Sequence, residues 1–496
     1  MQAAENGCNV KLVSSLPSER AQSVMAEGGI NAALNTKDEN DSPEEHFTDT
    51  IKAACGLADP NAVWGMTQAA PELVHWLLKL GVKFNMSGYD DVDLRNFGGQ
   101  KKKRTAFAQS DTGKQIMTAM IDAVRRKEAS GMVERFSHHS FLTLRLCGNI
   151  CCGCVIRDEY SQETVELPGD AVIVATGGMH GLFGNTTGSL SNTGEVTAEL
   201  FRLGVPLANG EMIQYHPTTV KCGGKRMLIS EAARGEGGRL FAMKDGKQWY
   251  FMEEKYPELG NLMPRDITAR EIWKVSHESE VFLDMTEISE EIISNKLSGL
   301  ADDCMTYLHK DIRKEPVSVL PGIHYFMGGI LVDEQHRTPI QNLYAAGECC
   351  AQYHGANRLG GNSLLGALYG GRVAAKSACE QADVVDLSCA TQIDVPPASQ
   401  ISEIKQLNKV MQETMGVVRN ENTLLNGIQT VQALTGNLPL LGMAVLKSAL
   451  ARKESRGAHW REDYPKSNDD DYLKTTVARF DGKQIQISFV PVPERR

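Results

Sequence analysis

Three short apolar segments, NVKLVSS, DAVIVATGG and NLYAAGECC, constrain the fold of this chain most strongly. Each is too short for a typical helix, and their apolar character favours strands that are buried on both faces of a parallel sheet. The second segment is followed by the helical pattern NTGEVTAELFRLGV. The third is followed by HGANRLGGNSLLGALYGGRVAAKSACEQA, a glycine-rich loop that continues into a helix. Strand, glycine turn and helix in this order predict an α/β fold in which helix N-termini bind an anionic group.

Glycine pairs recur along the chain. Glycine makes up 46 of the 496 residues, more than the roughly 7% that is usual. Because glycine has no Cβ, a pair suits a loop that approaches a ligand closely or adopts positive φ. The pairs include Gly28-Gly29, Gly98-Gly99, Gly177-Gly178, Gly237-Gly238, Gly328-Gly329, Gly360-Gly361 and Gly370-Gly371. Their spread predicts a long ligand that passes many loops.

The charge balance and the hydropathy pattern exclude several classes of protein. The chain has 52 Lys and Arg against 62 Asp and Glu, a net charge of −10, which disfavours nucleic-acid binding. No stretch approaches the ~18–20 uninterrupted apolar residues that span a bilayer, and no signal peptide is visible. We therefore expect a cytoplasmic protein with no nucleic-acid partner and no membrane span of its own. The one tight basic cluster, residues 101–104, predicts a solvated loop.

The cysteines are not spaced as a disulfide scaffold or a metal site. There are 12 in the whole chain, which is sparse compared with disulfide-stabilised domains. The densest group is Cys147, Cys151, Cys152 and Cys154. The surrounding segment NICCGCVIRDE predicts a strand, on which Cys151 and Cys152 would point to opposite faces. We prefer this interpretation to zinc or an iron–sulfur cluster, and predict no metal.

The sequence pattern changes twice along the chain. Residues 1–211 and 326–396 hold the strand and helix pattern of an α/β domain in two parts. Residues 212–325 mix short strands with a charged helix, DITAREIWKVSHESE, and predict an inserted α+β domain. In residues 397–496, segments with helical spacing come after Pro396 and Pro397. An irregular acidic stretch, Asn468–Asp471, and a strand-like tail follow these segments. A helical C-terminal domain is predicted there.

Eight motifs occur in one order along the chain: SVMAEGGINAAL, IQYHPT, SEAARGEGG, MPRDI, HYFMGGI, AAGE, HGANRLGGNSL and KESRGAHWREDYP. Together they resemble the flavoprotein subunit of succinate dehydrogenase and fumarate reductase, within the wider group that includes L-aspartate oxidase. The resemblance covers nearly the whole chain. It implies a Rossmann-like FAD-binding domain over residues 1–211 and 326–396, a hinged capping domain over residues 212–325, and a helical domain over residues 397–496.

The resemblance implies FAD as the cofactor. In the family, the flavin site is lined by Gly28, Gly29, Ala175, Thr176, Gly177, Gly178, Glu348, Ser363 and Leu364. Ser363 and Leu364 stand where a helix is expected to begin, so free amides there can face the electron-rich N1/O2 edge of a reduced flavin. Glu348 follows a predicted strand, where its carboxylate can accept a ribose hydroxyl.

Two departures from the family pattern bear on the cofactor. The family opens with a strand and a G-x-G-x-x-G turn, whereas this chain opens with QAAENGCNV, which resembles the end of the following helix. We expect a truncated or misassigned start; the alternative is a copy without FAD affinity. Gln22 stands where many respiratory members have a histidine that is joined covalently to the flavin, so we predict non-covalent FAD.

The resemblance also implies a clamp for a dicarboxylate, since a buried dianion needs cations and donors around it. His324 and Arg358 are expected to bind one carboxylate, and His216 and Ser230 the other. Arg265 of the PRD motif is the expected proton donor. An arginine, with a pKa above ~12, needs a relay for this task, and the resemblance offers Glu231 and Arg234. For Asp266 we predict the N-cap of a helix that starts at Ile267.

Three functions stay open at this stage. The first is fumarate reductase or succinate dehydrogenase, with Phe97 at the position where aspartate oxidases have a glutamate that can pair with the substrate ammonium. Glu27 also resembles the fumarate-reductase type. The second is an L-aspartate oxidase-like enzyme, and the third is a non-catalytic, truncated homologue.

The resemblance implies partner proteins as well. Members of this type pass electrons to an iron–sulfur subunit on a membrane anchor, which would place the chain at the cytoplasmic face of a membrane. In the family, Arg456, His459 and Arg461 lie toward the flavin and the domain junction. Ion pairing between domains is an equally good interpretation of these three residues.

Overall fold

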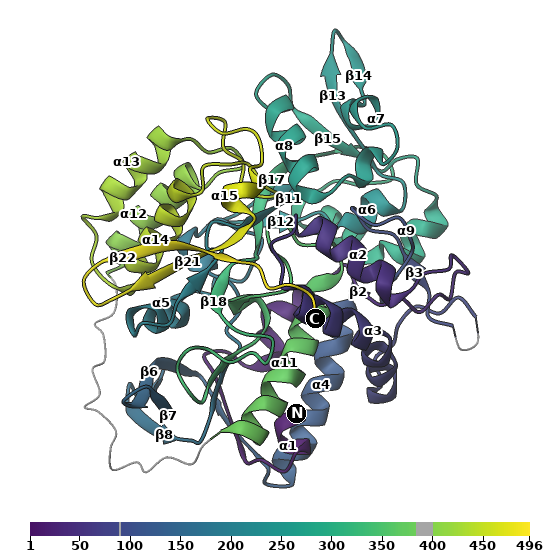
Figure 1. Ribbon diagram of the computed structural model, residues 1–496. Helices are drawn as coiled ribbons and strands as arrows, with labels where there is room; N and C mark the ends of the chain where they lie inside the picture. The colour runs from purple at the N-terminus through teal and green to yellow at the C-terminus, as the bar shows by residue number, and fades with distance from the viewer. Residues whose placement is uncertain (89–90, 383–399) are drawn as a thin grey trace.

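The computed structural model describes residues 1–88, 91–382 and 400–496, so that Pro396, Pro397 and the predicted boundary between residues 396 and 397 lie outside them. Figure 1 shows residues 212–325, called the capping segment below after the predicted domain, in teal at the upper right, and the C-terminal helices in yellow-green at the upper left. The α/β region, which contains the N-terminus, lies below both.

The α/β region contains the three predicted strands. They are β1 (Val10–Ser14), β9 (Val172–Val174) and β19 (Leu343–Ala345). β1 pairs in parallel with β5 (Val133–Ser137), and β9 pairs in parallel with β19. The α/β class is therefore confirmed, with the parallel strands arranged as separate pairs.

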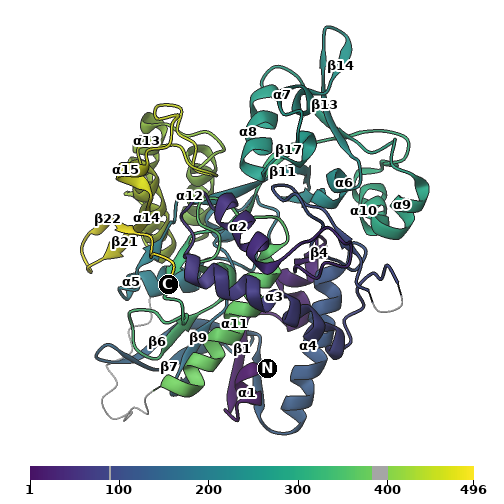
Figure 2. The same ribbon diagram turned by 45° about the vertical axis from the view of Figure 1, so that its right-hand side comes forward.

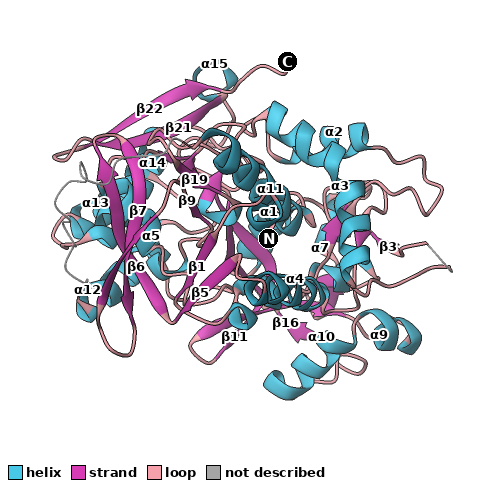
Figure 3. Ribbon diagram, turned by 90° about the horizontal axis from the view of Figure 1, so that it is seen from below, coloured by secondary structure: helices cyan, strands magenta, loops and turns pink. Residues whose placement is uncertain are grey.

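Helices surround these strands. The two predicted helices are present as α5 (Glu195–Arg202) and α11 (Asn362–Gln381). α11 packs against α1 (Gln2–Glu5) and α3 (Pro60–Leu80), as Figure 2 shows, and α4 (Thr112–Ala129) packs against β5 (Figure 3). Buried apolar side chains from α3, α4 and α11 form one core, including Met66, Leu73, Leu77, Ile116 and Leu365.

Shorter elements complete this region. α2 (Pro43–Ala53) packs on α3, and β2 (Ile30–Asn31), β4 (Thr105–Ala106) and β3 (Leu94–Arg95) form a small antiparallel sheet. Single helical turns lie at 18–20, 22–25, 180–182 and 347–349.

The cysteine-rich segment forms a strand, as predicted. β7 (Ile150–Asp158) lies between β6 (His139–Cys147) and β8 (Thr164–Pro168) in an antiparallel sheet. Cys151 and Cys152 are buried free thiols in this sheet. Among residues 1–88, 91–382 and 400–496, no group of His, Cys, Asp or Glu is arranged to hold a metal ion.

The capping segment is built from two antiparallel sheets and short helices. β12 (Lys225–Leu228), β11 (Ile213–Cys222) and β17 (Leu320–Phe326) form one sheet, and β14 (Lys247–Trp249), β13 (Arg239–Lys244), β15 (Val281–Asp284) and β16 (Val317–Ser318) form the other. The helices are α6 (Glu231–Gly235), α7 (Phe251–Lys255), α8 (Arg265–Val275), α9 (Glu290–Lys296) and α10 (Ser298–Asp303), with a single turn at 260–262 and a π-helical turn at 304–308. The pairing of β11 with β17 brings the two ends of this segment together.

The C-terminal segment is helical, but its tail belongs to a sheet of the α/β region. α12 (Ile401–Thr414), α13 (Glu421–Val431) and α14 (Asn437–Ala451) pack together. After them, the hairpin of β21 (Lys474–Phe480) and β22 (Ile485–Pro491) extends a sheet whose order is β20-β18-β10-β21-β22. The other strands are β10 (Leu207–Ala208), β18 (Gly329–Leu331) and β20 (Cys350–Ala351).

Three predictions about local structure are wrong. Arg104 of the basic cluster is fully buried, because Asp41 and Asp49 both pair with its guanidinium. α8 begins at Arg265 with Pro264 as its N-cap, so Asp266 lies inside the first turn. The acidic stretch is not irregular: Asn468 caps the helical turn α15 (Asp469–Tyr472).

None of the helices in the described ranges combines the length and the apolar character that crossing a bilayer requires.

Candidate active site

Two arginines and one carboxylate of the capping segment form a buried ion cluster. Nε and Nη2 of Arg265 donate to Oε2 of Glu231 at 2.8 and 2.5 Å. Nη2 of Arg234 lies 3.6 Å from Oε1 of Glu231, and the backbone amide of Gly98 donates to that oxygen at 2.8 Å. α6 carries Glu231 and Arg234, and α8 begins at Arg265. The structure therefore brings together the three residues predicted to move the proton.

The charges in this cluster decide its protonation. Burial acts to raise the pKa of Glu231, but the positive charges of Arg265 and Arg234 outweigh it, so its pKa lies below the ordinary value. Glu231 is therefore a carboxylate at neutral pH. Burial lowers the pKa of Arg234, and the charge of Glu231 acts in the opposite direction.

The two predicted substrate histidines lie side by side. The rings of His216 on β11 and His324 on β17 are 5.1 Å apart, edge to face. Nδ1 of His324 is hydrogen bonded to Oγ1 of Thr187 at 2.8 Å. His216 is 1% exposed, and its Nε2 has no hydrogen-bond partner. Burial, assisted by the charge of Arg265, holds the pKa of both rings well below 6.5.

Arg358 lies close enough to His324 and Arg265 for their charges to interact. Its guanidinium carbon is 4.4 Å from the ring centroid of Tyr325, and its Nε is buried without a hydrogen-bond partner. Burial, with the charge of Arg265 adding to it, lowers the pKa of Arg358 to about 9. Since its charge also acts on His324, the structure brings His216, Arg265, His324 and Arg358 around one place.

Sequence reasoning missed a residue that joins these groups. Gln214, two positions before His216, accepts from Nη1 of Arg265 at 3.1 Å and donates to the backbone oxygen of Arg358 at 2.8 Å. Its amide also donates to Asn357. The IQYHPT motif contains Gln214, but its amide gave no signal of this bridging contact.

Ser230 and Phe97 are the sequence neighbours of Glu231 and of Gly98, whose amide donates to Glu231. Ser230 caps α6, its Oγ accepting from the amide of Ala232 at 3.4 Å, and it interacts with the carboxyl of Glu27. The Phe97 ring is 1% exposed and lies against Gly28 and Gly360, where an added Cβ would come within 3.0–3.1 Å of it. Ser230 is therefore already engaged in a cap, and Phe97 presents an apolar wall.

The predicted cofactor residues form tight loops around α11 and the ends of β9 and β19. Ala175, Thr176, Gly177 and Gly178 follow β9, and Glu348 follows β19. An added Cβ on Gly178 would lie 2.6 Å from Oε1 of Glu348, and one on Gly29 would lie 2.5 Å from the backbone oxygen of Ala106. Some of these glycines are thus required by contacts within the protein itself.

The start of α11 fits the anionic edge of a flavin. Gly361 is the N-cap, with φ of 83°, and no side chain caps the helix. Ser363 and Leu364 lie in its first turn, where backbone amides have no intrahelical acceptor. The residues present therefore fit FAD at this position.

Gln22 lies in a single helical turn near the same loops. Its Oε1 accepts from the amide of Ser189 at 2.5 Å. This contact ties Gln22 to the segment after Gly178, and an amide side chain offers no nucleophile for a covalent flavin link.

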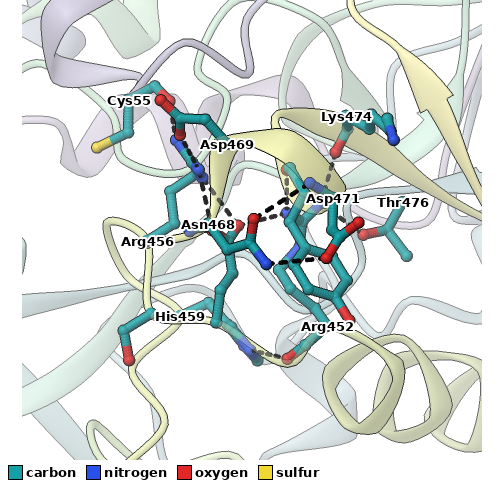
Figure 4. Close-up of polar contacts among 12 residues, drawn as sticks. Cys55, Arg452, Arg456, His459, Asn468, Asp469, Asp471, Lys474 and Thr476 are labelled. Carbon is teal, nitrogen blue, oxygen red and sulfur yellow. Dashed lines mark hydrogen bonds and ion pairs between the residues drawn. The ribbon is translucent and has the colours of Figure 1, made fainter. Parts of the chain in front are cut away.

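Arg456, His459 and Arg461 belong to a buried polar network, part of which Figure 4 shows. Arg456 pairs with Glu454 and Asp469 and donates to the backbone oxygen of Cys55, which lies between α2 and α3. His459 contacts the backbone oxygen of Arg452. Arg461 pairs with Asp463, two residues away. Arg456 therefore joins two regions of the chain, whereas Arg461 acts locally.

Arg452 is the centre of this network. It is 0% exposed, pairs with Glu211 and Glu454 at 2.7 Å, and donates to Thr476 at 2.7 Å (Figure 4). Glu211 lies two residues before β11, the strand that carries Gln214 and His216. The C-terminal segment thus holds one end of the capping segment.

Comparison with known proteins shows which family models and relatives this chain matches. The FAD binding domain family matches residues 1–364, and the family described as fumarate reductase flavoprotein C-term matches residues 434–495. The succinate dehydrogenase flavoprotein subunit of Bacillus subtilis is 37% identical over 100% of this chain and 95% of its own length. The 8-methylmenaquinol:fumarate reductase flavoprotein subunit of Wolinella succinogenes is 31% identical over 98% of this chain and 88% of its own.

Solved structures agree with these relatives. FrdA of E. coli quinol fumarate reductase matches with a TM-score of 0.89 and 27% identity, covering 99% of this chain and 94% of that chain. Sdh1 of Mycobacterium smegmatis, in its apo complex, matches with a TM-score of 0.82 and 28% identity over 100% and 92%. This chain belongs to the family of succinate dehydrogenase and fumarate reductase flavoprotein subunits, which are FAD-dependent oxidoreductases.

Proposed function

We propose that this chain interconverts fumarate and succinate. The observation that supports this most directly is the buried Nε of Arg358, which has no hydrogen-bond partner and whose guanidinium lies close enough to Arg265 for the two charges to interact. A buried cation without a partner is costly. A small dianion with a carboxylate at each end would accept from Nε of Arg358 and relieve the repulsion between Arg265 and Arg358.

The substrate contacts follow from this arrangement. His324 and Arg358 bind one carboxylate, since the guanidinium presents a planar fork of donors to it. His216, with Ser230 near it, binds the other. Phe97 offers no acceptor for an ammonium group, which favours a diacid without an amine over aspartate.

Arg265 donates the proton in the direction of fumarate reduction. FAD, when bound, supplies the hydride that reaches one olefinic carbon. Arg265 delivers a proton to the other carbon, so that fumarate gains two electrons and two hydrogens. The adjacent cations stabilise the negative charge that develops on the carboxylate.

Glu231 and Arg234 restore the proton on Arg265. Two nitrogens of Arg265 already contact Oε2 of Glu231, so the path starts at hydrogen-bond distance. Arg234 lies on the other oxygen of the same carboxylate. The carboxylate form of Glu231 keeps Arg265 charged between turnovers.

FAD is held without a covalent bond, and electrons reach it from a partner. Gln22 cannot form the histidyl link. An iron–sulfur subunit on a membrane anchor would supply or accept the electrons, which would place the chain at the cytoplasmic face of a membrane.

The test is turnover with a defined electron donor. The purified chain, supplied with FAD, should reduce fumarate with a reduced viologen dye and should not oxidise L-aspartate. Aspartate oxidation without fumarate reduction would favour the aspartate oxidase function. FAD binding with no turnover of either compound would favour a non-catalytic homologue.

A further inference from the structure

His180 is a buried histidine of the cofactor region that no part of the mechanism uses. It lies two residues after Gly178 and begins the helical turn at 180–182. Its ring is 0% exposed, and its Nε2 has no hydrogen-bond partner. A buried polar atom without a partner costs free energy unless a ligand or water satisfies it.

The unpartnered nitrogen faces Glu348. Nε2 of His180 lies 3.7 Å from Oε1 of Glu348, which is too long for a direct hydrogen bond. One hydroxyl group can contact two atoms at this separation. The same carboxylate oxygen already accepts from the amide of Phe326 at 3.0 Å, so its position is fixed.

The surroundings hold the ring in one orientation. Its edge packs against Phe326, with ring centroids 5.0 Å apart. Gly188 lies directly on the ring, because a Cβ there would come within 2.2 Å of it. Nδ1 of His180 is hydrogen bonded to Oγ1 of Thr186 at 3.0 Å.

The hydrogen bonds around Thr186 favour one tautomer. Oγ1 of Thr186 already accepts from the amide of Gly188 at 3.2 Å, which leaves its hydrogen free to be donated to Nδ1 of His180. The proton of the neutral ring is then on Nε2, the nitrogen that faces Glu348. Burial supports the neutral form by lowering the pKa of His180 to about 4.

We infer that His180 is a further FAD-binding residue, which together with Glu348 contacts one hydroxyl of the bound dinucleotide. Nε2–H of His180 donates to the hydroxyl oxygen, and the Glu348 carboxyl accepts the hydroxyl hydrogen. The inference rests on the proposed function only through FAD binding and does not depend on the substrate.

The test measures the dissociation constant of FAD by fluorescence quenching in variants of position 180. His180→Asn removes the nitrogen that faces Glu348. We expect the dissociation constant of FAD to rise about fivefold to tenfold, which corresponds to the loss of one neutral hydrogen bond. His180→Gln places an amide nitrogen near the former Nε2, and we expect its dissociation constant to return to within about twofold of wild type.

His336→Gln is the matched control. His336 is equally buried, but both ring nitrogens have partners, the backbone oxygen of Ala345 at 2.7 Å and the hydroxyl of Tyr353 at 2.5 Å. We expect this variant to lower the melting temperature without changing the dissociation constant of FAD.

Other results would overturn the inference. Equal FAD affinity of His180→Asn and wild type would show that Nε2 of His180 makes no contact with FAD. Equally weakened FAD binding in His180→Asn, His180→Gln and His336→Gln would indicate that the substitutions disturb the fold rather than one contact. A wild-type chain that binds no FAD would overturn both proposals. FAD binding with the expected variant pattern but no fumarate turnover would overturn the proposed function alone.

Discussion

Arg265 and Glu231 share a two-point contact in which Nε and Nη2 of the arginine both donate to one carboxylate oxygen, Oε2, at 2.8 and 2.5 Å. The third arm of Arg265, Nη1, donates to Gln214. Because all three nitrogens are directed by fixed acceptors, the guanidinium has one orientation. This geometry makes position 265 sensitive to a change of side-chain shape at constant charge.

The change Arg265→Lys tests the proton donor. Lysine keeps the positive charge but cannot reach Glu231 and Gln214 with a planar fork. We expect viologen-linked fumarate reduction to fall below a tenth of wild type, while fumarate binding, followed by flavin absorbance, stays nearly intact. Arg270→Lys on the same helix is the control, since Arg270 lies over the ring of Trp460. An Arg265→Lys enzyme above a tenth of the wild-type rate would exclude this role.

The change Glu231→Gln tests the ion cluster. It leaves Arg265 and Arg234 buried without a counter-charge, and breaking such a pair typically costs about 3–5 kcal/mol. We expect lower stability in urea unfolding as well as lost turnover. Glu253→Gln is the control, because its pair with Arg239 is about 40% exposed and should contribute less than about 1 kcal/mol. Similar losses in the two variants would contradict this account.

Glu27 is expected to make stability depend on pH. Burial, with the charges of Asp303 and Asp111 adding to it, raises its pKa from 4.5 to about 8. The folded state therefore holds this proton more tightly than the unfolded state, and the free energy of unfolding falls as the pH rises from about 4.5 to 8. The total is on the order of a few kcal/mol.

The variant Glu27→Gln isolates this effect. Glutamine cannot ionise, so the variant should be more stable than wild type at pH 8–9 and should show a flatter dependence of melting temperature on pH. Glu258→Gln, at an exposed position, should leave the wild-type profile unchanged. An unchanged slope in Glu27→Gln would place the titration elsewhere.

Acid precipitation tests how FAD is attached. Because Gln22 cannot bond to the flavin and its oxygen is held by the amide of Ser189, we expect all flavin absorbance in the supernatant after trichloroacetic acid treatment. Yellow colour that stays with the precipitate, and flavin fluorescence on a denaturing gel, would contradict this prediction.

Local sequence patterns predicted the elements that depend on local chemistry. The strands β1, β9 and β19 and the start of α11 follow from short apolar runs and a glycine turn. Arg104 was misplaced because its partners, Asp41 and Asp49, lie far from it in the sequence. Asp266 was misplaced because Pro264 starts the helix at the next residue, as proline readily does.

In the candidate active site, too, local motifs predicted some residues, whereas others depend on contacts between distant parts of the sequence. The family motifs indicated His216, His324 and Arg358, and the fold brings them together. Gln214 and His180 escaped notice because a lone amide or histidine has no pattern of its own. Their roles depend on distances to Arg265 and Glu348, which only the tertiary structure shows.

The β21–β22 hairpin has a consequence for the order of events during synthesis. β21 pairs with β10 across more than 260 residues of chain, so one edge of β10 stays unpaired until residues 474–480 have left the ribosome. A nascent chain halted before residue 474 would expose β10 to other strands. Chaperones that protect such edges are therefore expected to stay bound until β21 has emerged.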